Sequence, residues 1–206
     1  AFLPSMGAQH ILLGLFDGPL IVTSANLSDM PMIRSEEEMF LMMDQNPKIA
    51  ETFFNSRKIV SGVDDSVVRV IDGQPQMIRR SKGYVPVPLY MEGGREEVFA
   101  TGGQLKNSFC LSKDGFVYPS QYFGDLDSLE NQRIYEETLT HMKKLLRIEP
   151  KKVVCDLHPL YFTTAFAEKY AEERNLPLFK VQHHHAHVAS VMAEHHIKGG
   201  IIGVSF

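Results

Sequence analysis

The order of strand-like and helical segments in the second half of the chain is the feature that most constrains its fold. Short apolar segments at residues 98–101, 109–112 and 116–119 predict three strands, and Lys113-Asp114-Gly115 predicts a tight turn that pairs the last two as a hairpin. Six further segments alternate between helix and strand. They are a helix that follows Asp127, a strand at 153–156, a helix at 161–174, a strand at 178–182, a helix at 184–196 and a strand at 201–206.

This order is that of a ribonuclease-H-like unit, which actin-like ATPases use twice. The first three strands are antiparallel through hairpins, whereas the later strands require right-handed parallel crossovers. The strand at 201–206 would then open a second copy of the unit. In open sheets of this kind, ligands bind beyond the carboxyl ends of the strands. We therefore predict an α/β lobe with a mixed sheet and a ligand site at that edge.

The helix after Asp127 has clear start and face signals. Asp127 is a candidate N-cap, with Glu130 three residues later as in a capping box. Its apolar face is predicted from helical spacing to consist of Tyr135, Leu139, Met142, Leu145 and Leu146.

The first half of the chain is less regular and predicts an α+β region. Ser35 is a plausible N-cap for a short acidic helix over residues 35–43. Strands are expected at 18–24, 59–60, 67–71 and 76–79, the last two paired around Asp72-Gly73. Residues 86–95 have the proline and glycine content of a linker. We expect domains at residues 1–90 and 96–206, joined by 91–95.

Four histidines lie within five positions in Val181-Gln182-His183-His184-His185-Ala186-His187-Val188. His183 and His187 are four residues apart, so on a helix they share one face and can bind one divalent cation. Two imidazoles are too few for a tight site, so a third ligand, a carboxylate, is expected from elsewhere. The alternatives are an adventitious metal-binding surface and a histidine that only caps the helix.

Two polar segments in the first half are candidates for nucleotide binding. Ser24 and Asn26 follow an apolar segment and offer a hydroxyl and an amide to phosphate or carbonyl oxygens. Arg69 and Arg79 can contact phosphate through a guanidinium fork, and Ser81 follows closely. The alternatives are an ordinary polar turn for the first segment and a solvated sheet edge for the second.

The segment from Thr101 to Ser108 lies between two expected strands and contains Gly102, Gly103 and Lys106. Paired glycines allow a backbone to approach a phosphate, and the lysine can neutralise its charge. The spacing is not that of a P-loop. Three further polar residues follow strands at the same edge: Asp125, Asp156 and His158. They are candidates to line the site, although Asp156 and His158 could equally organise the loop and cap the next helix.

Composition excludes several classes of function. The net charge of −4 does not indicate a nucleic-acid surface, and no apolar run approaches the roughly 20 residues that cross a bilayer. The only cysteines, Cys110 and Cys155, lie in apolar segments without a Cys-x-x-Cys pair, which is typical of free thiols in a reducing cytoplasm. The sequence opens on Ala1-Phe2 and closes on a strand-like segment, so we expect it to be part of a longer protein.

The chain resembles the HypF-type carbamoyltransferases that mature [NiFe] hydrogenases. The resemblance rests on PLIVTSANLSD (19–29), VDDSVVRV (63–70), RRSKGYVP (79–86), GGQLKNSFCL (102–111), QYFGDLDSLE (121–130), DLHPLYFTT (156–164) and VQHHHAHVASVMAEH (181–195). It implies the later part of a YrdC-like domain at residues 1–90 and the front lobe of an actin-like transferase domain at 96–206. Ser61-Gly62 departs from the basic or bulky polar residues that relatives usually have there.

The resemblance also implies a reaction. Carbamate derived from carbamoyl phosphate reacts with ATP to give carbamoyl-adenylate, and the carbamoyl group then passes to the C-terminal cysteine of the partner HypE. By this resemblance Ser24 and Asn26 bind the nucleotide, Arg69 with Arg79 or Ser81 lines the same pocket, and His183 and His187 bind a divalent metal. Zinc, iron and magnesium all remain open for that metal, and Mg²⁺ accompanies the nucleotide. The third metal ligand, an Asp, would lie in a lobe beyond Phe206, and His184 and His185 are not ligands.

Two other functions are compatible with the same residues. A threonylcarbamoyl transferase acting on tRNA shares both folds, although the acidic net charge does not favour tRNA. The chain could also be a nucleotide-binding or partner-docking module without catalysis. As an isolated piece, we expect it not to complete carbamoyl transfer.

Overall fold

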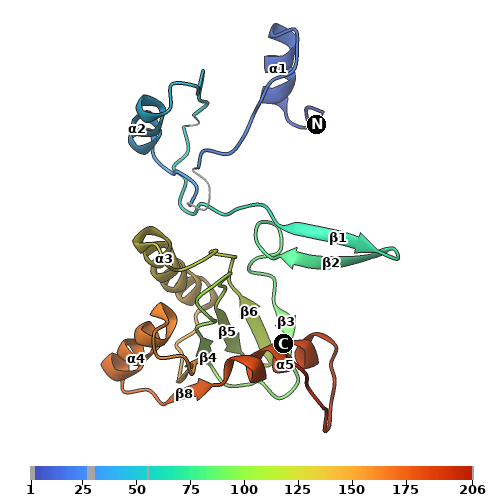
Figure 1. Cartoon of the computed structure of the whole chain (residues 1–206), viewed down its shortest axis with the longest axis vertical. Coiled ribbons are helices and arrows are strands. Elements are labelled where there is room, and N and C mark those ends of the chain that lie inside the picture. The colour runs from blue at the N-terminus through green and yellow to red at the C-terminus, as the bar shows by residue number, and fades with distance from the viewer. Residues whose placement is uncertain (1–2, 27–30, 55, 206) are drawn as a thin grey trace.

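The computed structural model of the chain describes residues 3–26, 31–54 and 56–205. Residues 27 and 28 of the polar segment after Asn26 therefore lie outside the described residues, as does Phe206. The second half forms a sheet covered by helices, and the first half extends away from it as two separate helices and a projecting hairpin (Figure 1).

The sheet of the second half has six strands in the order β3-β6-β5-β4-β7-β8. Neighbours along β3, β6, β5 and β4 are antiparallel, whereas β4, β7 and β8 are parallel. The strands are β3 (Leu89–Tyr90), β4 (Val98–Ala100), β5 (Cys110–Lys113), β6 (Phe116–Pro119), β7 (Lys152–Asp156) and β8 (Leu178–Val181). The predicted mixed α/β sheet is thus confirmed. Part of the predicted linker region, β3, adds an edge strand through its pairing with β6.

Three helices accompany this sheet: α3 (Leu129–Leu146), α4 (Phe162–Arg174) and α5 (His183–Glu194). The core lies where α3 and α4 pack on the sheet, with Phe99, Leu111 and Val153 fully buried (Figure 1). Tyr135 is also fully buried, and its ring meets Phe109 edge to face with centroids 5.3 Å apart. Burial of each such side chain contributes about 1.5–3 kcal/mol, so this cluster is the main apolar contribution to the stability of the second half.

The start of α3 differs from the prediction by one residue. Ser128, not Asp127, is the N-cap, and its hydroxyl accepts a hydrogen bond from Asn131 N at 3.1 Å. Asp127 instead accepts from Gln104 Nε2 at 2.8 Å. A second error concerns Leu145, which is 57% exposed, because Tyr135, Leu139 and Met142 already define the buried face and Leu145 is rotated away from it.

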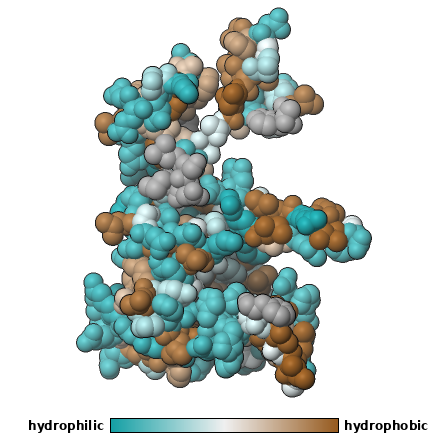
Figure 2. Space-filling model, in the orientation of Figure 1, coloured by the Kyte–Doolittle hydropathy of each residue, from teal (hydrophilic) through white to brown (hydrophobic). Residues whose placement is uncertain are grey.

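The first half contains α1 (Gly7–Leu15), α2 (Glu36–Gln45), β1 (Val67–Ile71) and β2 (Gln74–Arg79). Two predictions are confirmed: β1 and β2 pair as an antiparallel hairpin, and Ser35 caps α2 by accepting from Glu38 N at 3.2 Å. α1 was not predicted. Figure 2 shows apolar side chains on the surface of the projecting hairpin, where Val70 is 68% exposed.

Three predicted strands are wrong in the part of the chain that the structure describes. Residues 19–24, 59–60 and 201–205 are not strands. Ile21 is fully exposed, and Ile202 is 94% exposed. An apolar segment becomes a strand only when a neighbouring edge supplies hydrogen bonds and a surface to cover its side chains, and these segments lie against no such edge.

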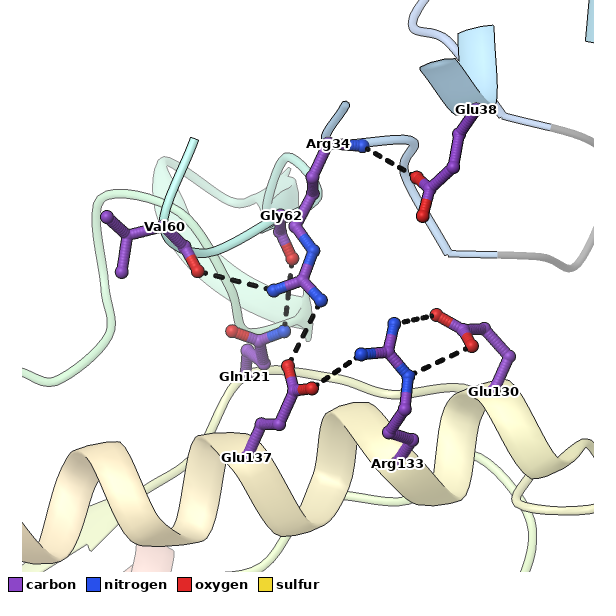
Figure 3. A network of polar contacts seen from close by, with 8 residues as sticks. All are labelled: Arg34, Glu38, Val60, Gly62, Gln121, Glu130, Arg133 and Glu137. Carbon is purple, nitrogen blue, oxygen red and sulfur yellow. Dashed lines mark hydrogen bonds and ion pairs between the residues drawn. The ribbon is translucent and has the colours of Figure 1, made fainter. Parts of the chain in front are cut away.

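The two halves meet through a polar network between the loop before α2 and the surface of α3 (Figure 3). Arg34 pairs with Glu137, with Nη2 and Oε2 3.0 Å apart, and also donates to Val60 O. Arg133 bridges Glu137 and Glu130 on the same helix. Nearby, Gln121 Nε2 donates to Gly62 O at 3.3 Å. None of the described helices is both long and apolar enough to cross a membrane.

Candidate functional site

The first turn of α5 brings His183 and His187 together. Their Nε2 atoms are 3.0 Å apart, and the ring centroids are 4.7 Å apart at 77°. The residue before the helix, Gln182, is its N-cap, so His183 does not cap α5. The imidazoles therefore converge as the sequence spacing predicts, just beyond the carboxyl end of β8.

The carboxylate of Asp156, the last residue of β7, contacts Nδ1 of His183, the ring nitrogen that does not face His187. Its Oδ2 is 2.6 Å from His183 Nδ1, and its Oδ1 accepts a hydrogen bond from His158 N at 2.8 Å. One oxygen of Asp156 therefore organises the loop and the other contacts the histidine pair, as two of the predictions had it. The predicted capping of the next helix by Asp156 or His158 is wrong, because Tyr161 is the N-cap of α4 and its side chain makes no capping hydrogen bond. The sequence showed only a carboxylate at the end of an expected parallel strand. The fold shows that this strand, β7, lies beside β8, which leads into His183.

The paired glycines lie beside the same imidazole. A Cβ built on Gly103 would be 3.4 Å from Cε1 of His183, so backbone and ring are close. Gly102 has φ +74°, and a Cβ there would approach Ser108 O to 2.4 Å. The turn is braced by Asn107, whose Nδ2 donates to Thr101 O at 3.1 Å and to Gly103 O at 2.5 Å. Asn107, which the sequence analysis did not single out, thus fixes the position of the glycines.

Lys106 lines a different site, a cavity of about 510 Å³ between the two halves. The first half contributes Ser24, Asn26, Met32, Gly62, Asp64 and Arg79, and the second half contributes Lys106, Gln121, Tyr122, Asp125 and Asn131. Arg79 packs its guanidinium over the Tyr122 ring, with Cζ 4.7 Å from the centroid. The backbone N of Lys106 donates to Asp125 Oδ1 at 2.8 Å, and this hydrogen bond fixes the backbone at position 106.

The predicted nucleotide-binding residues therefore fall into groups. Ser24, Asn26, Arg79 and Lys106 line one cavity, and Ser24 Oγ donates to Asn26 Oδ1 at 2.8 Å. Arg69 lies on the projecting β1–β2 hairpin opposite Gln76 and does not line this cavity. Ser81 is fully buried, and its backbone N donates to Ser66 Oγ at 2.8 Å.

The histidine pair fits a nitrogen-preferring cation. It offers two converging imidazole nitrogens, one of them on a ring held by a carboxylate, which is a common arrangement around zinc and iron. Within the described ranges, no group of three or more His, Cys, Asp or Glu side chains could bind a metal ion. The expected third ligand is therefore not among these residues.

Comparison with known proteins decides the family. A model described as the HypF Kae1-like domain matches residues 94–194, and one described as telomere recombination, for the Sua5, YciO and YrdC proteins, matches residues 1–81. The carbamoyltransferase HypF of Synechocystis sp. is 36% identical over 201 residues, which cover 96% of this chain and 25% of that protein. The chain belongs to the HypF family.

Other HypF proteins agree. Carbamoyltransferase HypF of Rhizobium leguminosarum bv. viciae is 36% identical over 90% of this chain and 24% of its own length. A crystal structure of full-length HypF in the phosphate- and nucleotide-bound form superposes with a TM-score of 0.84 at 36% identity, covering 99% of this chain and 32% of that one. The HypF structure from T. kodakarensis gives a TM-score of 0.74 at 40% identity, covering 85% and 23%. The chain spans about a quarter of the length of these curated HypF relatives.

Proposed function

We propose that this chain serves in ATP-dependent carbamoyl transfer during [NiFe] hydrogenase maturation. In this proposal residues 1–90 belong to a YrdC-like domain that forms carbamoyl-adenylate, residues 96–206 form one lobe of the transferase domain, and 91–95 link them. The last strand of the first segment, β3, pairs with β6 in the sheet of that lobe. The observation that carries the proposal is the position of Gly103 beside the His183 ring, which supports a single site made of the glycine turn and the histidine pair.

The cavity between the halves supports nucleotide binding. Arg79 and Lys106 supply positive charge, and Ser24 and Asn26 supply neutral hydrogen-bonding groups. This combination suits the phosphates of ATP, accompanied by Mg²⁺. The HypF structure with phosphate and nucleotide bound gives independent support, since its fold matches nearly the whole chain. Arg69 and Ser81 remain predicted ligand residues outside this cavity.

The histidine pair supports a resident divalent cation. His183 and His187 would bind it through Nε2, and their nitrogen donors favour zinc or iron over magnesium, which prefers oxygen. When bound, such a cation supplies Lewis acidity toward a phosphate or carbonyl oxygen. The chain itself orients the two imidazoles and places the backbone of Gly103, a residue without a side chain, beside the His183 ring.

The proposed overall reaction takes its carbamoyl group from carbamoyl phosphate, by way of carbamate. ATP activates carbamate as carbamoyl-adenylate and releases pyrophosphate. The C-terminal cysteine sulfur of HypE then attacks the carbamoyl carbon, a C–S bond forms, and the C–O bond to AMP breaks. We place this chemistry in the cytoplasm, where Cys110 and Cys155 remain free thiols.

A chimeric enzyme tests this function. The 206 residues replace the matching segment of Synechocystis HypF, and transfer of labelled carbamoyl phosphate to purified HypE is measured with ATP present. We expect HypE labelling that requires ATP and is lost in the His183→Ala, His187→Ala chimera. The matched control is His195→Ala, which changes a histidine at the other end of α5. A folded chimera that labels HypE equally well without the histidine pair would refute the proposal.

A further inference from the structure

The carboxylate of Asp156 makes two separate hydrogen bonds from a nearly buried position. Its side chain is only 6% exposed. Oδ1 accepts from the backbone N of His158, and Oδ2 lies 2.6 Å from Nδ1 of His183. The main chain beneath it is fixed as well, because Thr164 Oγ1 donates to Asp156 O at 3.2 Å. Each oxygen therefore has a fixed partner.

Two further contacts limit how the His183 ring can turn. The backbone of Gly103 lies beside Cε1 of the ring. Tyr161 presents its ring edge to His183, with centroids 6.4 Å apart at 78°, and is itself stacked on His158 at 4.2 Å. These contacts leave Nε2 directed toward His187.

We propose that Asp156 is a positioning residue that selects the Nδ1–H tautomer of His183 and so turns the Nε2 lone pair toward the cation site. An ionised carboxylate only accepts hydrogen bonds, so the ring nitrogen facing it must carry the proton. In a neutral imidazole the other nitrogen then has the free lone pair. The inference rests on the proposed function for the cation itself, but the tautomer is a property of the protein alone.

Asparagine at position 156 tests this requirement without changing the shape of the side chain. An amide has one acceptor oxygen and one donor NH₂ group, whereas the site presents two donors, His158 N–H and His183 Nδ1–H. If the oxygen keeps the loop bond to His158, the NH₂ group faces His183 and favours a lone pair on Nδ1. The proton then moves to Nε2, where it competes with a cation.

The experiment combines imidazole nitrogen NMR of the metal-free chain with Zn²⁺ titration of the Synechocystis HypF chimera, in which the rest of HypF can supply the third ligand. We expect His183 to carry its proton on Nδ1 in the wild type and to shift toward Nε2–H in Asp156→Asn, with Zn²⁺ affinity lowered about 10–100-fold. Asp156→Glu should retain the wild-type tautomer. Thr164→Val is the matched control, because it removes the bond to the backbone of Asp156 but leaves the carboxylate.

The outcomes separate this inference from the function on which it rests. An unchanged His183 tautomer and unchanged Zn²⁺ affinity in folded Asp156→Asn would overturn the positioning role. Equal loss of Zn²⁺ affinity in Thr164→Val would also overturn it, because loop order and not the carboxylate would then be responsible. A His183 tautomer that changes in Asp156→Asn, together with a wild-type chimera that binds no Zn²⁺, would uphold the positioning of His183 and refute the cation proposal instead.

Discussion

Gly103 and His183 are 80 residues apart in sequence, yet a Cβ on the glycine would lie 3.4 Å from Cε1 of the imidazole. This distance is at the lower edge of ordinary van der Waals contact, so one methyl group fits beside the ring, and we expect a branched side chain to crowd it. We predict that Gly103→Ala preserves Zn²⁺ binding at the histidine pair, whereas Gly103→Val displaces the ring and lowers the affinity about tenfold or more. Calorimetric titration of both variants measures the difference. Equal affinities would contradict the contact.

The neighbouring residue, Gly102, leads to a prediction about the free energy of unfolding. Gly102 has φ +74°, and a Cβ would approach Ser108 O to 2.4 Å and Asn107 Nδ2 to 2.7 Å. Gly102→Ala should therefore lower the free energy of unfolding by about 1–3 kcal/mol, because both the backbone conformation and the close approach are strained. Urea unfolding measures this loss. The control is Gly73→Ala, which shares a positive φ of +74° but has open space around the Cβ, so it should cost less.

The contact between the halves predicts an energetic coupling between Arg34 and Glu137. Their side chains are 23% and 44% exposed, so solvent screens the pair and its coupling should be about 0.5–1 kcal/mol. A double-mutant cycle with Arg34→Met and Glu137→Gln measures it from unfolding curves at low and high salt. We expect the coupling to fall as salt rises. A coupling of zero at low salt would mean that the network in Figure 3 does not join the halves.

Lys106 predicts where the nucleotide phosphates bind. Lys106 lines the cavity together with Ser24, Asn26 and Arg79. Lys106→Ala should weaken binding of a non-hydrolysable ATP analogue about tenfold or more, since a hydrogen bond from a charged group is worth about 1.5–3 kcal/mol. Lys169→Ala, on the exposed surface of α4, is the matched control. Identical affinities for the two variants would place the phosphates elsewhere.

The raised pKa of the Cys110 thiol predicts that its alkylation rate and its contribution to stability depend on pH. Burial raises the pKa of its thiol to about 11, above the ordinary value of 9.0. The thiolate is therefore rare at pH 8, and alkylation of Cys110 in the native protein should be slow until the pH nears 11. The folded state favours the neutral thiol, so this contribution to stability is complete below pH 9 and is lost as the pH rises toward 11. Mass spectrometry of alkylated native protein follows the reaction, and rapid labelling of Cys110 at pH 8 would contradict it.

The sequence predicted best those features that depend on local spacing. The hairpin at Asp114-Gly115, the Ser35 cap and the convergence of His183 with His187 each follow from residues a few positions apart. The predictions were wrong where a residue far away in the sequence determines the hydrogen bonding. Asp127 bonds to Gln104 and leaves the capping of α3 to Ser128, a competition that spacing cannot reveal.

Long-range neighbours also explain what the sequence missed in the site. Asp156 was a candidate only as a strand-end carboxylate, and its bond to His183 depends on β7 and β8 lying side by side. Lys106 was expected to share a site with Gly103, but it lines the cavity between the halves, and its backbone N donates to Asp125. Ile21 was predicted to lie in a strand because its segment is apolar, but it is fully exposed. Burial also needs a surface that covers the side chain, which the sequence does not show.

The cation at the histidine pair is the central claim, and metal binding tests it most directly. The wild-type chimera with Synechocystis HypF, in which the rest of HypF can supply the third ligand, and its His183→Ala, His187→Ala variant are titrated with Zn²⁺ in the presence of ATP, and bound metal is measured after dialysis. We predict stoichiometric Zn²⁺ in the wild type and its loss in the variant, with His184→Ala, His185→Ala retaining the metal. Equal Zn²⁺ in the wild type and the His183→Ala, His187→Ala variant would contradict the account.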